Sequence, residues 1–256
     1  MPNIVGKLKR MISGGRAYYG QAIGILLFDG RRYPALPGDV ANASSYDFPV
    51  RLKVAKGVFD VPVPPEHWID GEPPDNARRM GEAAVELRDE GVRAIITSCG
   101  FFVSLQDYLA KLVGIPVFTS PLILIPLLSR MLGNRKLGIL TASKSLLGDD
   151  FLKVAGVDGQ NIVIEGIEDS TEFYATHMGG NRTDMDAELL RSEVVGIARR
   201  FAGGHPDMGG MLIECSNLPT FSAEIQSVTG MPVFDYITFA RFLHASVVQS
   251  PYDGFM

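Results

Sequence analysis

The chain has 256 residues, of which 46% are apolar and 21% are charged, the balance of a globular protein with a sizeable core. The net charge is −5 and basic residues do not form long runs, so we expect no nucleic-acid-binding surface. No apolar stretch is long enough to span a membrane and no signal peptide is recognisable, so we expect a cytoplasmic protein whose two cysteines stay reduced.

In the first half of the chain, short apolar runs alternate with helical patterns. After an arm that ends at Gly20, the sequence predicts a buried strand over residues 22–28 that closes on Asp29. Residues 33–74 hold eight of the sixteen prolines and one expected strand, at 50–55, so we interpret them as a loop system that acts as a lid or a subunit contact. The other elements expected here are a helix over 76–90 capped by Asp75, a strand over 93–98, a helix over 102–113 and a strand over 115–118.

The second half repeats this alternation. It opens with residues 123–132, which are apolar nearly all round and predict a helix buried between lobes or subunits, kinked at Pro126. The following elements are strands over 136–140, 161–165, 210–214 and 232–235, helices over 143–155, 184–201, 219–229 and 238–248, and a loop around 166–180. Short apolar strands that alternate with helices predict parallel sheets covered on both faces.

The two halves share a spaced motif around their cysteines. Cys99 and Cys215 each end an apolar strand, and each is followed 15 residues later by a glycine that opens the pattern Gly-(Ile or Met)-Pro-Val-Phe. This repeat predicts an α/β protein of two pseudo-symmetric three-layer α/β/α lobes with parallel sheets and an active-site cleft between the lobes. We expect an N-terminal lobe over 1–118, a C-terminal lobe over 119–234, and a C-terminal helix within 235–256 that packs back on the first lobe.

The position of the two cysteines predicts catalysis. Ligands of open α/β sheets bind beyond the carboxyl ends of the strands, and facing lobes would bring both sulfur atoms to one cleft. Helix N-termini there would lower the thiol pKa and bind an anionic group. Cys99 and Cys215 are therefore the expected acid–base pair, one removing a proton next to a carboxylate and the other delivering one.

Several residues near the strand ends are candidates for contacting the substrate, although turn or helix capping would explain some of them equally well. Ser98 and Glu214 are expected to point away from the cleft because side chains alternate along a strand. The four histidines show no metal-ligand spacing and no nucleotide-binding motif is present, so we expect no metal and no cofactor. The substrate-binding candidates are Asp29, Thr97, Gly100, Phe101, Thr141, Ser143, Ser216 and Asn217.

Four motifs carry a resemblance to a known family. They are Thr-Ser-Cys-Gly-Phe at 97–101, Pro-Val-Phe-Thr-Ser at 116–120, Gly-Ile-Leu-Thr at 138–141 and Glu-Cys-Ser-Asn-Leu-Pro at 214–219. With them the chain resembles the aspartate/glutamate racemase superfamily, which includes hydantoin racemases, maleate isomerases, arylmalonate decarboxylases and some dimethylsulfoniopropionate lyases. The resemblance implies paired cysteines that act on a carbon bearing a carboxylate or related acyl group.

Departures from the family pattern narrow the expected activity. Gly100 and Phe101 stand where the amino-acid racemases have Asn-Thr, and Ser216 and Asn217 stand where glutamate racemases have Thr-His, so classical glutamate racemase is disfavoured. Both cysteines are kept, which argues against decarboxylases, since these keep only one. We expect a homo-oligomeric, cofactor-independent isomerase that racemises or epimerises a small carboxylate-bearing substrate such as aspartate, glutamate or a hydantoin.

Two alternatives remain open at this point. The first is maleate-isomerase-like, lyase or decarboxylase chemistry of the same superfamily, and the isomerases and lyases cannot be separated from racemases because they share both cysteines. The second is a two-lobed protein that only binds a small molecule, although simple binding gives no reason for paired thiols.

Overall fold

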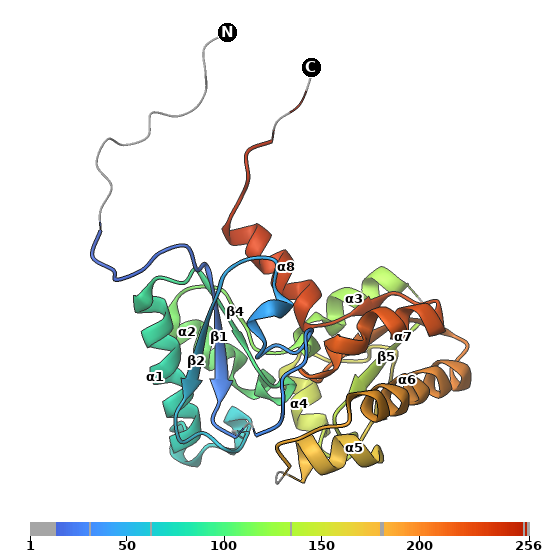
Figure 1. Cartoon of the computed structure of the whole chain (residues 1–256). Helices are drawn as coiled ribbons and strands as arrows, with labels where there is room; N and C mark the ends of the chain where they lie inside the picture. The colour runs from blue at the N-terminus through green and yellow to red at the C-terminus, as the bar shows by residue number, and fades with distance from the viewer. Residues whose placement is uncertain are drawn as a thin grey trace.

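Two four-stranded sheets, each made of parallel strands, form the framework of the protein (Figure 1). The computed structural model describes residues 14–30, 32–61, 63–133, 135–179, 182–252 and 254. The first sheet has the order β2-β1-β3-β4 and the second the order β6-β5-β7-β8. The strands are β1 (Ile23–Phe28), β2 (Val50–Ala55), β3 (Ala94–Thr97), β4 (Val117–Phe118), β5 (Lys136–Thr141), β6 (Ile162–Gly166), β7 (Met208–Ile213) and β8 (Val233–Phe234).

The two sheets have the same strand order, so the two repeated halves of the sequence fold in the same way. In the first sheet Ile23 is paired with Val50 on one side and with Ala94 on the other, and β5 plays the same central part in the second sheet. The central strands are buried on both faces because helices cover them, so their sequences are continuous apolar runs. The predicted α/β fold with parallel sheets is therefore confirmed.

The helices lie around the sheets in the expected alternation, with the first half of the chain beside the second (Figure 1). Helix α1 packs against β1, β2 and α2, and helix α8 returns from the end of the chain to lie against β3. The α-helices are α1 (Asp75–Glu90), α2 (Gln106–Val113), α3 (Ile125–Leu132), α4 (Asp149–Val154), α5 (Thr171–Phe173), α6 (Ala187–Gly204), α7 (Ser222–Thr229) and α8 (Tyr236–Val247). Short 3-10 helices are η1 (Ala43–Ser45), η2 (Pro65–His67), η3 (Ile69–Gly71), η4 (Gly100–Leu105), η5 (Pro121–Leu124) and η7 (Leu218–Phe221), and η6 (Tyr174–Met178) is a π-helical turn.

Three local predictions were wrong. Asp75 is the first residue of α1 rather than its cap and pairs with Arg79 at 2.6 Å. Pro126 lies in the first turn of α3, where its missing N–H would have no partner in any case, so it produces no kink inside the helix. The expected helix over 143–155 is reduced to α4, and the Ser143 side chain, which lies outside the helix, bonds Glu168.

Helix α3 is not buried all round within the chain. Leu127 and Met131 are 57% and 64% exposed, although the opposite face of the helix belongs to the core. Burial of these two side chains would need a second chain, and the expected homo-oligomer stays a prediction.

One apolar core runs through both halves. A single cluster of buried side chains joins Ile25 and Ile96 of the first sheet to Leu137, Ile139 and Leu212 of the second. The halves are thus packed on each other rather than linked by a hinge alone. Within the described residues, no helix combines the length and the apolarity needed to cross a membrane.

Candidate active site

The two cysteines occupy equivalent places in the two sheets and line one pocket. Cys99 follows the end of β3 by two residues, and Cys215 follows the end of β7 by two residues. Because β3 and β7 hold the same position in their sheets, the loops that carry the cysteines converge between the halves. The pocket measures about 210 Å³, and its wall is formed by Phe28, Tyr33, Val61, Ser98, Cys99, Gly100, Phe101, Ala142, Leu146, Phe173, His177, Met178, Glu214, Cys215, Ser216 and Asn217.

The two cysteine loops are joined directly to each other. The Ser216 hydroxyl donates a hydrogen bond of 2.6 Å to the backbone oxygen of Ser98. Ser98 in turn accepts a hydrogen bond of 3.4 Å from the backbone N–H of Phe28. Each loop therefore helps to fix the other, and the pocket between them is largely preformed.

Cys215 is the more buried of the two thiols. It is 6% exposed, whereas Cys99 is partly exposed, and its thiol donates to the side-chain oxygen of Asn217 at 3.5 Å. Burial raises the pKa of Cys215 well above its usual range, and the charge of Glu214 adds to this effect. The expected lowering of this thiol pKa by a helix N-terminus is wrong, because desolvation outweighs the one hydrogen bond from the backbone of Asn217.

Part of the proline-rich segment crosses from the first half to the loop of Cys215. We call residues 33–46 the strap. Asn217 donates hydrogen bonds to Asp39 at 2.7 Å and to the hydroxyl of Tyr33 at 3.1 Å, and the Val40 backbone N–H donates to the backbone oxygen of Ser216 at 3.1 Å. The strap thus holds Ser216 and Asn217 in place, while a lid or subunit-contact role for residues 33–74 stays a prediction.

Aromatic side chains form a continuous part of the pocket wall. The His177 ring stacks on Phe173 with centroids 4.6 Å apart, and its centroid lies 3.9 Å from that of the Tyr33 ring. The Thr176 hydroxyl lies 2.6 Å from Nδ1 of His177 and also donates to the backbone oxygen of Glu172. Phe101 completes the wall from the other cysteine loop.

Four of the eight predicted substrate-binding residues line the pocket and four do not. Gly100, Phe101, Ser216 and Asn217 are in its wall. The other four serve the loops around it, because their side-chain oxygens are already used by protein partners. Asp29 accepts from the backbone N–H of Gly57, Thr97 donates to the backbone of Thr119, Thr141 donates to Glu214, and Ser143 donates to Glu168 and accepts from the backbone N–H of Leu146.

Ser98 and Glu214 were expected to point away from the cleft, and both are among the residues around the pocket. Their side chains are buried and bond protein groups, Ser98 accepting from the Phe28 backbone and Glu214 from the Thr141 hydroxyl. The alternation of side chains applies only within a strand, and β3 ends at Thr97 while β7 ends at Ile213. Both residues therefore lie in the turns that follow, where the backbone no longer alternates.

Several other residues of the pocket wall were not recognised as site candidates from the sequence. Tyr33 comes from the strap, and Phe173, His177 and Met178 come from α5 and η6, which lie inside the stretch expected to be a loop. A π-helical turn often marks a functional site, but a helix this short leaves no periodic pattern to detect.

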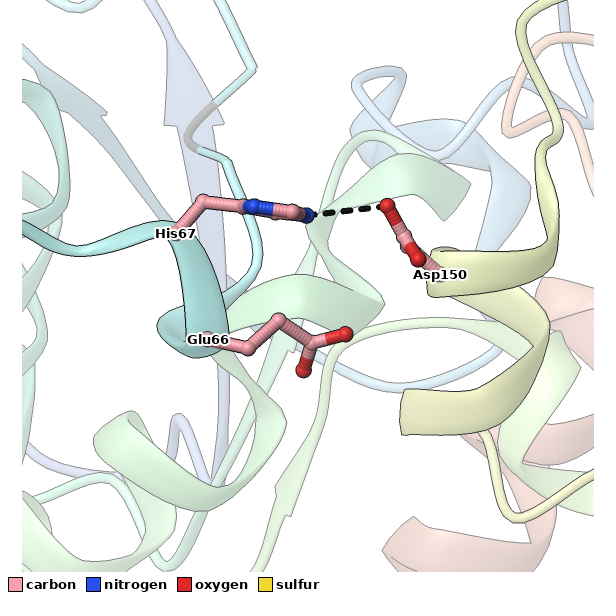
Figure 2. A group of neighbouring side chains, drawn as sticks. All are labelled: Glu66, His67 and Asp150. Carbon is pink, nitrogen blue, oxygen red and sulfur yellow. Dashed lines mark hydrogen bonds and ion pairs between the residues drawn. The ribbon is translucent and has the colours of Figure 1, made fainter.

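One group of side chains in the described residues could hold a metal ion. Glu66 and His67 of η2 point toward Asp150 of α4, with His67 Nε2 2.9 Å from Asp150 (Figure 2). All three are exposed, and their possible ligand atoms lie within 4.8 Å of one another. None of them lines the cysteine pocket, so this group is separate from the site built around Cys99 and Cys215.

Comparison with curated proteins identifies close relatives. A dimethylsulfoniopropionate lyase from Durusdinium sp. clade D is 31% identical over 242 residues, which cover 91% of this chain and 77% of that protein. Dimethylsulfoniopropionate lyase 3 from Emiliania huxleyi (strain CCMP1516) is 30% identical over 243 residues, again 91% of this chain but 61% of that protein. This chain thus spans about three fifths of the length of the second relative. No protein-family model matches this chain.

Solved structures with a similar fold include a decarboxylase and an aspartate racemase homologue. Unliganded arylmalonate decarboxylase matches with a TM-score of 0.54 and 17% identity over 90% of this chain and 94% of that one. An aspartate racemase homologue from Pyrococcus horikoshii OT3 also has a TM-score of 0.54 and 17% identity, over 88% of this chain and 99% of that one. At this identity the likeness concerns the fold alone.

The prediction of an isomerase was wrong, because the curated relatives at about 30% identity over most of the chain are named lyases. The resemblance to the racemase superfamily is confirmed at the level of the fold. The chain therefore belongs to the dimethylsulfoniopropionate lyase family.

Proposed function

We propose that the protein is a lyase that cleaves dimethylsulfoniopropionate into dimethyl sulfide and acrylate, or a closely similar onium carboxylate into its own neutral leaving group and unsaturated acid. The observation that carries this proposal is the pair of cysteines on one small pocket, in a chain whose relatives are named for this cleavage. Dimethylsulfoniopropionate has a carboxylate at one end and a positively charged sulfur at the other. The pocket needs a base for the carbon between them and a surface that accepts a cation.

The proposed reaction is an elimination that balances without a cofactor. A thiolate removes a proton from the carbon next to the carboxylate, and the electrons of that C–H bond form the double bond of acrylate. The bond between the neighbouring carbon and sulfur breaks, and its electron pair leaves with the sulfur as neutral dimethyl sulfide. The proton stays on the cysteine and then passes to water, so the leaving group needs no acid.

The environments of the two cysteines support Cys99 as the base. Cys215 is held as a neutral thiol near neutral pH, because burial and Glu214 raise its pKa. Cys99 is more exposed and faces the same pocket, so its thiolate is easier to solvate. Cys215 then lines the site without adding a second negative charge.

The aromatic wall supports a cationic substrate. A sulfonium group over the faces of Tyr33, Phe101 or Phe173 would be attracted by the negative face of each ring. Such contacts stabilise a cation by about 0.5–2 kcal/mol each when water is excluded. An aspartate or glutamate substrate would gain less from these rings, because its side chain is anionic.

The test is to incubate the reduced protein with dimethylsulfoniopropionate and measure dimethyl sulfide by gas chromatography and acrylate by proton NMR. The native chain should form both products in equal amounts. Cys99→Ser should lose roughly 10²–10⁴-fold in kcat, as expected when a base is removed. Cys215→Ser should keep more activity than Cys99→Ser. Absence of product from folded, reduced protein would disprove the function, and full activity of Cys99→Ser would disprove the assignment of the base.

A further inference from the structure

Glu214 lies where the loops of the two cysteines meet. It precedes Cys215 in the chain, and its side chain is turned toward the loop of Cys99. The carboxyl group fills the space next to Gly100, since a Cβ built at residue 100 would lie only 1.8 Å from Glu214 Oε1. Glu214 is 1% exposed, so this carboxyl group contacts both loops away from water.

The two carboxyl oxygens of Glu214 have unequal surroundings. Oε2 accepts a hydrogen bond of 2.8 Å from the Thr141 hydroxyl, and the backbone of Ala142 also donates to the carboxyl group. Oε1 is buried and has no hydrogen-bond partner in the described part of the chain. A buried carboxylate with one unbonded oxygen is costly, and the neutral acid costs less because it carries no charge. Burial accordingly raises the pKa of Glu214 to about 7.

The groups that can change charge around Glu214 are mostly acidic. Cys99 and Cys215 flank it, Tyr236 of α8 responds to its charge, and Asp39 of the strap adds to the field at Cys215. His177 lies across the pocket. A negative charge on Glu214 therefore acts first on Cys215, its neighbour in the chain and an equally desolvated group.

We propose that Glu214 is a positioning residue that makes the two cysteines chemically different, because its carboxylate, once ionised, holds the neighbouring Cys215 in the neutral thiol form. Glu214 does not contact the reacting atoms in this role. It adds to the effect of burial, which is the larger cause of the raised Cys215 pKa, and Cys99 is the more exposed of the two thiols. The consequence for turnover rests on the proposed lyase function, but the effect on the thiol does not.

The test measures the reactivity of Cys215 without any substrate. In a Cys99→Ser background Cys215 is the only thiol. Its rate of alkylation by iodoacetamide is followed between about pH 6.5 and about pH 9.5, where a thiol of raised pKa reacts in proportion to its small thiolate fraction. Glu214→Gln keeps the size of the side chain and removes its charge. We expect it to increase the alkylation rate at pH 8 about tenfold, the effect of lowering a thiol pKa by one unit.

Two further variants separate charge from packing. Glu214→Asp keeps the charge but withdraws the carboxyl group from Gly100, and should stay within about threefold of the parent. Thr141→Val removes a donor to the carboxylate and so favours its acid form, which should increase alkylation between about pH 7 and 8. An unchanged rate in both Glu214→Gln and Thr141→Val would overturn the proposal. Equal acceleration by Glu214→Asp and Glu214→Gln would also overturn it, because loosened packing would then explain the result. Inactivity of the native chain toward dimethylsulfoniopropionate would leave these outcomes as informative as before.

Discussion

Replacement of Gly100 by alanine tests the contact between the two cysteine loops. The new Cβ would lie 1.8 Å from Oε1, 2.4 Å from Cδ and 2.6 Å from the backbone oxygen of Glu214. Ordinary contact begins at 3.4 Å, so the carboxyl group would have to move by roughly 1.6 Å and the backbone by roughly 0.8 Å. Rotation of the side chain relieves only the first of these overlaps.

The expected loss of stability follows from these two displacements. Overpacking of a closed site costs about 1–3 kcal/mol, and loss of the hydrogen bond from Thr141 adds about 1 kcal/mol. We therefore expect Gly100→Ala to lower the free energy of unfolding by about 2–4 kcal/mol, or the melting temperature by roughly 4–16 °C for a chain of this size. Proposed lyase activity should fall as well, because Cys99 is the preceding residue.

The assay is urea denaturation followed by circular dichroism. Gly203→Ala is the matched control, because no atom lies within 4 Å of the position that its new Cβ would take and alanine is favoured in a helix such as α6. The double variant Gly100→Ala/Glu214→Ala removes the carboxyl overlap but keeps the backbone overlap, so it should recover only part of the loss. A Gly100→Ala protein within about 0.5 kcal/mol of the native chain would refute the reasoning.

Three other measurements address the same region and its surroundings. The pKa of Glu214 is about 7 in the folded protein against an ordinary value of 4.5, so the stability linked to its proton is complete below about pH 4.5 and is lost as the pH rises through 7. Glu214→Gln should therefore match the native chain near pH 4.5 and exceed it by up to about 3 kcal/mol at pH 8 in urea titrations, and an equal difference at both values would contradict this. Asn217→Asp places a carboxylate opposite Asp39 in place of a donor at 2.7 Å, and should cost at least about 2 kcal/mol in thermal denaturation, whereas an unchanged melting temperature would exclude the contact. His67→Ala breaks an ion pair with Asp150 whose side chains are 52% and 57% exposed, so stability should change by less than about 1 kcal/mol, and a larger loss would indicate that the pair fastens the two halves.

The sequence contained enough information to predict the framework of the fold. Apolar runs such as 22–28 and 136–140 are buried strands because helices cover both faces of each sheet, and this pattern is visible without coordinates. The equal spacing after Cys99 and Cys215 also predicted that the two residues would occupy equivalent places. These features are local or periodic, and such patterns can be recognised from one sequence alone.

The pocket wall was less predictable because its parts come from distant and irregular segments. Tyr33 and Asn217 are 184 residues apart, and their contact depends on the path of the strap. His177 belongs to a π-helical turn of five residues, too short to show a period. The alternation argument for Glu214 does not apply, because β7 ends at Ile213, one residue before it. The aromatic wall could not be predicted, since these segments assemble it.

The asymmetry between the cysteine loops bears on the direction of the chemistry. A racemase converts each enantiomer into the other. Two similar acid–base groups on opposite faces of the substrate suit this reversible reaction. In this chain Ser98 precedes one cysteine and the buried Glu214 precedes the other, while Gly100 and Ser216 follow them. The two sheets have the same strand order, but the residues beside the two cysteines differ in chemistry. Such a site suits the proposed lyase reaction, which begins with proton removal on one side and ends with departure of dimethyl sulfide.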